Sequence, residues 1–312
     1  MSHNLLETLN NKMLIFNYLK KTIKKKLPIH SKLYIFLLFI KSFKLEFLKI
    51  LLKLIRISLF NKKEKIILKI NKNKINFVAN SFYTTSYFLY DEIPEKPILD
   101  FLYNYFHNKK KSTFLDVGGY VGLHSFVVKV ANQNSKIHIF EADKNKCHIL
   151  RKNITINKFN NINLNEQFIT SSKHFKNPND FTKYTKNEIS INQYLNKKNI
   201  SNVDVIKMDI EGIEFSALDN VNFNKIKILL VEFHSKIIRE NLKQDPNILI
   251  NKLKKNYNLF YFDHRKNNNN KILKLTKRKI LEKDQFMLIC SKKKLAYLEK
   301  YLKTKVSINK IK

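Results

Sequence analysis

The chain has 312 residues, of which 44% are hydrophobic, with a formal net charge of +35 and two cysteines. This length and hydrophobic content exclude an intrinsically disordered chain, and the two cysteines exclude a disulfide scaffold or a structural zinc site. Only 5 of the 60 basic residues are arginine, the residue best suited to bidentate phosphate and base recognition. Most of the lysine excess is therefore expected to be solvated surface, and nucleic acid is not expected as a partner.

The first 64 residues are expected to form a basic helical extension. Residues 1–75 contain 18 basic and 3 acidic residues, and charges recur from Lys41 to Arg56 within an otherwise apolar stretch. A membrane-spanning helix needs about 20 largely uncharged residues, so residues 41–56 are predicted to form a basic amphipathic helix instead. Such a helix either lies on a membrane surface or packs against the rest of the chain, and both interpretations remain open. No secretory signal is expected.

Residues 65–110 are predicted to contain a strand hairpin and a lead-in helix. Two short apolar runs, at 65–70 and 75–80, flank the polar segment NKNK, which indicates a hairpin or a small sheet. Residues 98–106 follow with a helical pattern.

Short apolar strands then alternate with helices over residues 111–295. Strands are expected at 114–117, 136–140, 163–170, 203–209 and 227–233, and helices at 123–131, 144–157, from 214 onward and at 246–255. Two late strands, at 258–263 and 285–290, are expected to pair as an antiparallel hairpin. This order is typical of an α/β protein with a parallel sheet covered on both faces. Residues 296–312 are expected to be a basic C-terminal tail.

The four glycines of the chain lie in two short motifs. Gly118, Gly119 and Gly122 follow a buried strand and precede a helix. This pattern predicts a turn that presents backbone N–H groups at the carboxyl edge of the sheet. The segment does not match GxGxxG, because Tyr120 stands at the second glycine position. Asp116 at the strand end suits a ligand that carries positive charge or hydroxyls, as S-adenosylmethionine does.

An acidic side chain follows the next strand. Glu141 lies 25 residues after Asp116. An acid at about this distance beyond a glycine turn accepts hydrogen bonds from ribose hydroxyls in dinucleotide-binding folds. Glu141 is therefore a candidate for binding the ribose of an adenosine cofactor, with helix capping as the alternative.

A third motif, at 203–215, combines a lysine with several acids. Lys207, Asp209, Glu211 and Glu214 lie at the end of the fourth strand and in the turn that contains Gly212. Acids at this edge could orient a hydroxyl nucleophile or take its proton. Asp209 and Glu211 could also ligate a metal ion, and Glu214 could simply complement a helix N-terminus.

Together these segments resemble the FkbM family of S-adenosylmethionine-dependent methyltransferases. The family pattern of DVGANIG, FEP, an Asn-containing helix end, IKIDVEGAE and VEFH corresponds here to DVGGYVG, FEAD, Asn153 and Asn157, IKMDIEGIE and VEFH. Gly119, Tyr120 and Ala142 replace the usual Ala, Asn and Pro. The resemblance covers approximately residues 80–290 and leaves out the basic N-terminal extension.

The resemblance implies the class I methyltransferase fold, with a seven-stranded, mostly parallel sheet that has one antiparallel strand. It also implies S-adenosylmethionine as the cofactor and O-methylation of a hydroxyl on a sugar, glycolipid or similar metabolite. The candidate catalytic residues are Asp209, Glu211, His234 and Lys207. The candidate cofactor-binding residues are Asp116, Gly118, Gly119, Tyr120, Gly122, Glu141 and Asn157. No metal site is assigned, and dependence on a divalent metal is left open.

Two other function classes fit part of this pattern. A nucleic-acid or protein methyltransferase would share the glycine turn, but the chain has no Pro-Pro and neither cysteine follows a proline. A non-catalytic membrane-surface adaptor would keep the basic helix without needing the acids. The expectation is a cytoplasmic enzyme with a small-molecule or glycan substrate, and any contact with a membrane surface would be made by residues 41–56.

Overall fold

The computed structural model describes residues 64–79, 93, 95–171, 187–240, 243–262, 272–275, 284–303 and 306–311. These segments belong to one compact unit, Lys63–Lys312. The amphipathic helix expected at 41–56 lies outside the described residues. Among the described segments, none forms a helix with the length and apolar character that a membrane span requires.

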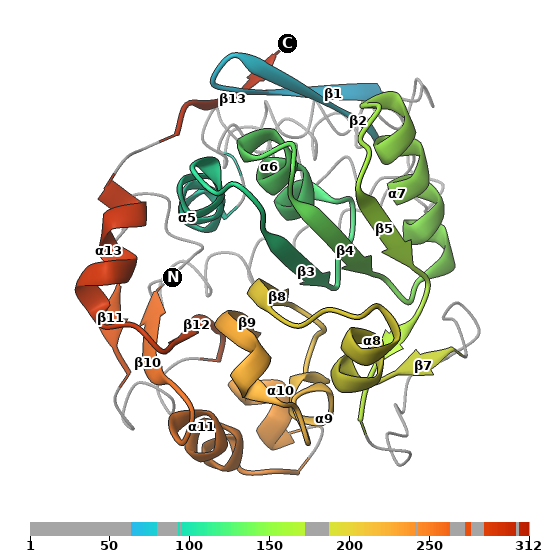
Figure 1. Ribbon diagram of the computed structural model, residues 1–312. Coiled ribbons are helices and arrows are strands. Elements are labelled where there is room, and N and C mark those ends of the chain that lie inside the picture. Colours follow the sequence, from blue (N-terminus) through green and yellow to red (C-terminus); the bar gives the residue numbers. More distant parts are fainter. Residues whose placement is uncertain are drawn as a thin grey trace, which may run out of the picture. The chain divides into compact units, whose positions relative to one another are not determined.

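The main sheet has eight strands in the order β11-β10-β12-β9-β8-β3-β4-β5 (Figure 1). Their bounds are β3 Thr113–Val117, β4 Lys136–Phe140, β5 Ile162–Asn165, β8 Val203–Met208, β9 Ile226–Phe233, β10 Asn258–Phe262, β11 Leu273–Lys274 and β12 Phe286–Ser291. Pairing is parallel from β5 through β9, whereas β12 is antiparallel to both of its neighbours. The expected seven strands with one antiparallel member are confirmed, and the short β11 adds an eighth strand at the edge.

Helices connect the parallel strands. Their bounds are α6 Leu123–Ala131, α7 Lys144–Ile156, α8 Ile191–Lys197, α9 Glu214–Ala217, α10 Ser235–Glu240 and α11 Pro246–Lys254, with a 3-10 turn, η2, at Phe223–Lys225. Because each crossover returns the chain to the start of the next strand, the carboxyl ends of β3, β4, β8 and β9 meet at one edge of the sheet. The candidate residues of all three motifs follow these strand ends.

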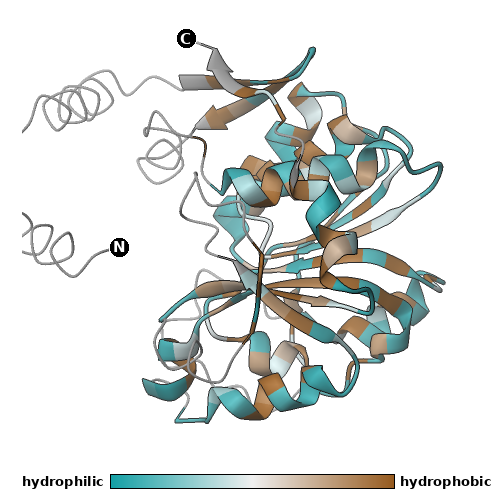
Figure 2. Ribbon diagram, turned by 90° about the vertical axis from the view of Figure 1, so that its left-hand side faces the viewer, coloured by the Kyte–Doolittle hydropathy of each residue, from teal (hydrophilic) through white to brown (hydrophobic). Residues whose placement is uncertain are grey.

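Alternating side chains of the strands separate two hydrophobic cores. Phe114 and Val205 belong to the core covered by α6, α7 and α5 (Lys96–His107). Leu115 and Ile206 belong to the opposite core, which α8 and α11 cover. Figure 2 shows hydrophobic residues running along the strands between these layers. The prediction of a sheet buried on both faces is therefore confirmed.

A smaller sheet has the order β13-β1-β2. Strands β1 (Glu64–Ile70) and β2 (Asn73–Ala79) form the expected hairpin, and β13 (Ile308–Ile311) pairs antiparallel to β1. The expectation of a C-terminal tail is wrong. Helix α13 (Leu295–Lys303) buries Leu298 and Leu302 in the same core as α5, and β13 completes the small sheet. Apolar side chains among the lysines, rather than net charge, determine how this segment folds.

The third strand also differs from its prediction. The expected strand at 163–170 is divided into β5 and β6 (Phe168–Ile169), and β6 pairs with β7 (Glu188–Ile189) in a separate two-stranded sheet. The short β6–β7 pair leads directly into α8.

Candidate active site

The glycine turn joins the ends of three neighbouring strands. The backbone N–H groups of Gly118 and Gly119 both donate to the carbonyl of Phe140 at the end of β4, at 2.9 and 3.1 Å. Gly118 has a φ of +83°, and a Cβ atom built on it would lie 1.9 Å from the carbonyl oxygen of Asp209. A side chain at position 118 would therefore collide with backbone, so the packing of the turn requires glycine there.

Glu141 binds the tip of this turn. Its Oε2 accepts from the backbone N–H of Tyr120 at 3.0 Å, and its Oε1 accepts from the N–H of Asp143 at 2.9 Å. Burial raises the pKa of Glu141, although the nearby Lys146 and the two N–H donors oppose this rise. The capping of α7 is performed by Asp143, whose side chain accepts from the N–H groups of residues 145 and 146. Asp143 rather than Glu141 therefore caps the helix.

A buried lysine occupies the same sheet edge on the side of α5 and α6. Lys207 is 2% exposed and lies opposite Asp116 in the pairing of β8 with β3. Its Nζ is 3.4 Å from Oδ2 of Asp209. Burial alone lowers the pKa of Lys207, but the surrounding carboxylates, with Asp209 first and Asp116 next, raise it overall. Lys207 is therefore a cation at neutral pH, and it offsets the negative charge of the neighbouring carboxylates.

Asp116 contacts α6 on the same side of the sheet. Its Oδ2 accepts from the Ser125 hydroxyl at 2.7 Å. Its Oδ1 is buried without a hydrogen-bond partner among the described residues. Nearby, Nε2 of His124 lies 3.0 Å from Oε2 of Glu95, which precedes α5. Neither member of this His–Glu pair was predicted.

Asp209, Glu232 and His234 converge at the ends of β8 and β9. One carboxylate or ring-nitrogen atom from each lies within 4.8 Å of the other two. Glu232 and His234 are buried, whereas the side chain of Asp209 is 26% exposed. Burial and the neighbouring Glu232 raise the pKa of Asp209 well above its ordinary value, and Lys207 only partly offsets this.

His234 is held from both sides. Its Nδ1 lies 3.1 Å from Oε1 of Glu214, and its Nε2 lies 2.8 Å from the amide nitrogen of Gln285. Burial would lower the pKa of the imidazole, but the hydrogen bond and charge of Glu214 raise it to about 9. Glu214 also accepts from the backbone N–H of Ile210 at 3.3 Å. Its main contacts are thus with His234 and the preceding turn.

Gln285 and Glu232 were not predicted as site residues. The Gln285 amide donates to Oε1 of Glu232 as well as facing His234. Glu232 lies in the VEFH segment and could have been nominated from it. No sequence pattern identifies Gln285. It reaches the site only because the antiparallel strand β12 begins beside the end of β9, where Phe286 pairs with Phe233.

Two predicted residues lie apart from this cluster. Glu211 is exposed in the turn after Asp209, with a φ of +56°, and its carboxylate does not join the cluster in the described part of the chain. Asn157 follows α7, and its side chain donates to the carbonyl and accepts from the N–H of Asn76 in β2, both at 2.7 Å. Helix α7 starts at the carboxyl edge and runs away from it, so its end lies about 20 Å along the axis. The structure therefore shows a contact with β2 in place of the predicted cofactor contact.

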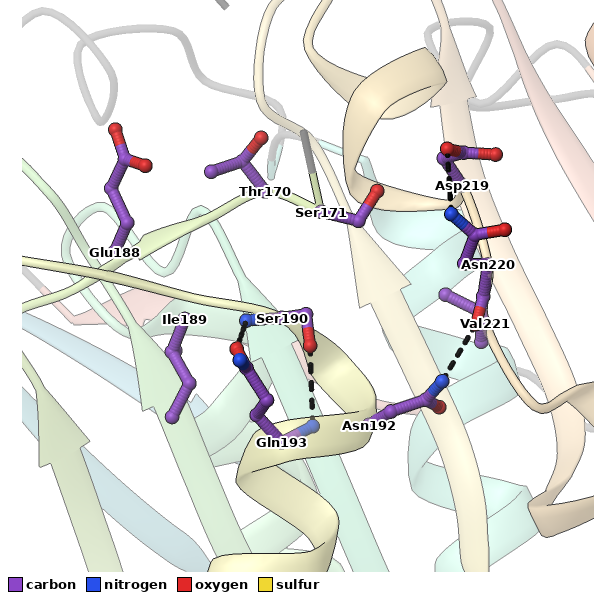
Figure 3. Close-up of a pocket in the computed structure, with 10 residues that line it drawn as sticks. All are labelled: Thr170, Ser171, Glu188, Ile189, Ser190, Asn192, Gln193, Asp219, Asn220 and Val221. Carbon is purple, nitrogen blue, oxygen red and sulfur yellow. Dashed lines mark hydrogen bonds between the residues drawn. The ribbon is translucent and has the colours of Figure 1, made fainter. Parts of the chain in front are cut away.

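A polar pocket of about 320 Å³ lies elsewhere in the unit, between β7, α8 and the turn after α9 (Figure 3). Ser190 and Gln193 hydrogen-bond each other across the first turn of α8, and Asn192 donates to the carbonyl of Asn220. These polar groups are occupied in holding the local structure. No residue of the Asp209–Glu232–His234 cluster lines this pocket.

Residues 116–260 match the family model described as the methyltransferase FkbM domain. No curated protein matches the chain. Similar solved structures include a SAM-dependent methyltransferase from Agrobacterium tumefaciens, at 12% identity and a TM-score of 0.41, covering 74% of this chain and 71% of that chain. Another is precorrin-6y C5,15-methyltransferase from Geobacter metallireducens GS-15, at 10% identity and a TM-score of 0.37, covering 61% and 85%. The family match runs from Asp116 past His234 and so includes most of the candidate site.

Proposed function

We propose that the chain, of which residues 116–260 match the methyltransferase FkbM domain, methylates a hydroxyl group of a sugar, glycolipid or similar metabolite, with S-adenosylmethionine as the methyl donor. The observation that carries this proposal is the backbone contact between Gly118 and Asp209. It brings the turn proposed to hold the cofactor against a group of side chains that can accept a hydroxyl proton.

The residues around the glycine turn fit this cofactor. Each carboxylate oxygen of Glu141 uses one lone pair on a backbone N–H, which leaves further acceptor capacity for ribose hydroxyls. Oδ1 of Asp116 is a buried acceptor without a partner in the described residues, as a site for a cationic or hydroxyl-bearing ligand would require. Asp116, Gly118, Gly119, Tyr120 and Glu141 are the residues proposed to hold the cofactor. When bound, S-adenosylmethionine supplies the methyl group.

Asp209 is the best placed of the acids to receive the acceptor's proton. It is the most exposed member of the cluster, and its raised pKa brings its basicity closer to neutral pH, where general-base assistance is most effective. Lys207 beside it fixes the position of the carboxylate. His234 is held in a fixed orientation by Glu214 and is the second candidate, but its pKa of about 9 means that it must first lose its own proton. The exposed Glu211 lies outside the cluster and is the least supported of the predicted catalytic residues.

Calorimetric titration with S-adenosylhomocysteine tests the cofactor half of this proposal. Saturable binding to one site is expected, and its absence at millimolar ligand would contradict it. The acceptor half is tested with labelled S-adenosylmethionine and extracts fractionated into glycans, lipids, protein and RNA. Label is expected in the glycan or lipid fraction as methyl ethers. Incorporation confined to protein or RNA would overturn the hydroxyl assignment while leaving the cofactor assignment intact.

A further inference from the structure

The cluster at the ends of β8 and β9 has the composition of a metal site. It offers two carboxylates and one imidazole, from Asp209, Glu232 and His234, within 4.8 Å of one another. Three atoms that bind one divalent ion in tetrahedral or octahedral geometry lie about 3–4 Å apart, since each metal–ligand distance is about 2.0–2.3 Å. Separations of up to 4.8 Å would therefore have to shorten by as much as about 1–2 Å, which side-chain rotation can supply. Their strand-end positions already direct them to a common point.

Carboxyl groups outnumber basic groups around the cluster among the residues that the structure describes. Five carboxyl groups lie near three basic side chains: Asp116, Asp209, Glu232, Glu95 and Glu214 against Lys207, His234 and His124. Oε2 of Glu214 is also buried without a hydrogen-bond partner among the described residues. A divalent cation bound among these carboxyl groups would offset their negative charge.

The side-chain amide of Gln285 can present either its nitrogen or its oxygen to this cluster. Its amide nitrogen now donates toward Glu232 and His234. A rotation of the amide by about 180° exchanges its nitrogen and oxygen without moving the rest of the side chain. The same side chain would then present a carbonyl oxygen, a ligand that hard divalent cations accept.

We propose that Asp209, Glu232 and His234 bind a divalent metal ion, with the amide oxygen of Gln285 as a fourth ligand. One oxygen of Asp209 can bind the ion while the other stays near Lys207 and remains available to accept the proton of the hydroxyl. The mixed oxygen and nitrogen donor set suits Mn²⁺, with Mg²⁺ and Zn²⁺ as alternatives. The inference rests on the proposed function in one respect: the ion's open position would bind the acceptor hydroxyl oxygen at the place where the methyl group is transferred.

Mn²⁺ alone is the probe for this site. Full-length, chelator-treated protein without a polyhistidine tag is titrated with Mn²⁺ by calorimetry, with the free ion followed by electron paramagnetic resonance. We expect one saturable site. Glu232→Gln keeps the size of the side chain and removes its charge, and should weaken Mn²⁺ binding by about tenfold or more, as even outer-shell changes at metal sites do. Glu240→Gln is the matched control, because Glu240 is exposed at the end of α10, and it should bind like the wild type.

A second variant keeps the proposal testable if Glu232→Gln fails to fold. Gln285→Glu should lower the melting temperature without metal, because it adds a carboxylate to the cluster, and should tighten Mn²⁺ binding. Equal Mn²⁺ affinity in wild type and Glu232→Gln, weaker binding by Gln285→Glu, or no wild-type binding at millimolar Mn²⁺ would each overturn the site. S-adenosylhomocysteine is titrated into the same samples. Binding of that ligand without Mn²⁺ binding contradicts the metal site alone, whereas the reverse contradicts the proposed function alone.

Discussion

Gly118 and Asp209 touch through their backbones. A Cβ atom on Gly118 would lie 1.9 Å from the Asp209 carbonyl oxygen, and the Asp209 N–H donates to the carbonyl of Val117 at 2.9 Å. Two motifs about 90 residues apart in sequence thereby form one unit at the sheet edge. A substitution that moves the backbone of one motif is therefore expected to move the backbone of the other.

The first prediction concerns this contact. Gly118→Ala should destabilise the protein by about 2–5 kcal/mol, because a left-handed backbone conformation costs about 1–2 kcal/mol and overpacking about 1–3 kcal/mol. Denaturant unfolding followed by circular dichroism measures this change. Gly119→Ala is the comparison, since its backbone φ is not positive and its Cβ would meet the side chains of Ile139 and Leu150 rather than backbone; a smaller destabilisation is expected, because the Ile139 side chain must shift. A Gly118→Ala protein as stable as the wild type would show that the turn can move away from Asp209.

The second prediction concerns the ribose site. Glu141→Gln keeps an acceptor for one of the two backbone N–H groups and removes the charge. It should weaken binding of S-adenosylhomocysteine by about 1–3 kcal/mol, the range for a lost hydrogen bond to a charged group. Calorimetry measures the affinity, and Glu188→Gln on exposed β7 is a control expected to bind normally. Cofactor affinity within twofold of the wild type would remove Glu141 from the binding site.

The third prediction separates chemistry from structure at Asp209. Asp209→Asn keeps the shape of the side chain and removes its basicity and charge. Turnover should fall by about 10²–10⁴-fold, the usual contribution of general-base assistance, while S-adenosylhomocysteine affinity changes little. Melting temperature, affinity and turnover are measured on one preparation. Loss of activity in step with loss of thermal stability would instead indicate that Asp209 mainly holds the turn and Lys207 in place.

The fourth prediction concerns the asparagines at the end of α7. Asn157→Ala removes both hydrogen bonds to Asn76 and should destabilise the protein by about 1–3 kcal/mol, because two β2 backbone groups lose their partners. Cofactor affinity should stay within twofold of the wild type. A selective loss of affinity in a stable variant would restore Asn157 to the cofactor site.

Asn153 offers a contrasting case in the same helix. Its Oδ1 accepts from the N–H of Val78, and its Nδ2 donates to the carbonyl of Val121 in the glycine turn, at 2.8 and 3.2 Å. Its replacement should therefore disturb both β2 and the turn. Comparing Asn153→Ala with Asn157→Ala shows how far the small sheet influences cofactor binding.

The sequence by itself determined the fold class and the three motifs. Apolar runs of strand length alternate with helical patterns, and this short-range periodicity predicts a parallel α/β sheet without knowledge of any contact. The chain has four glycines, and they mark the turn at Gly118 and the acidic segment around Gly212. Adjacent motifs at successive strand ends also predict a common edge, because parallel strands place their carboxyl ends together.

Only the tertiary structure decided which side chains meet there. Gln285 reaches His234 because β12 is antiparallel and begins where β9 ends, a pairing between residues about 50 positions apart. Glu211 and Asp209 are two residues apart, yet the turn leaves one exposed and places the other in the cluster. The segment at 296–312 has a basic composition, but α13 and β13 fold because their few apolar residues find partners in α5 and β1. Contacts between distant segments depend on the relative positions of whole strands and helices, which local patterns of charge and hydropathy do not specify.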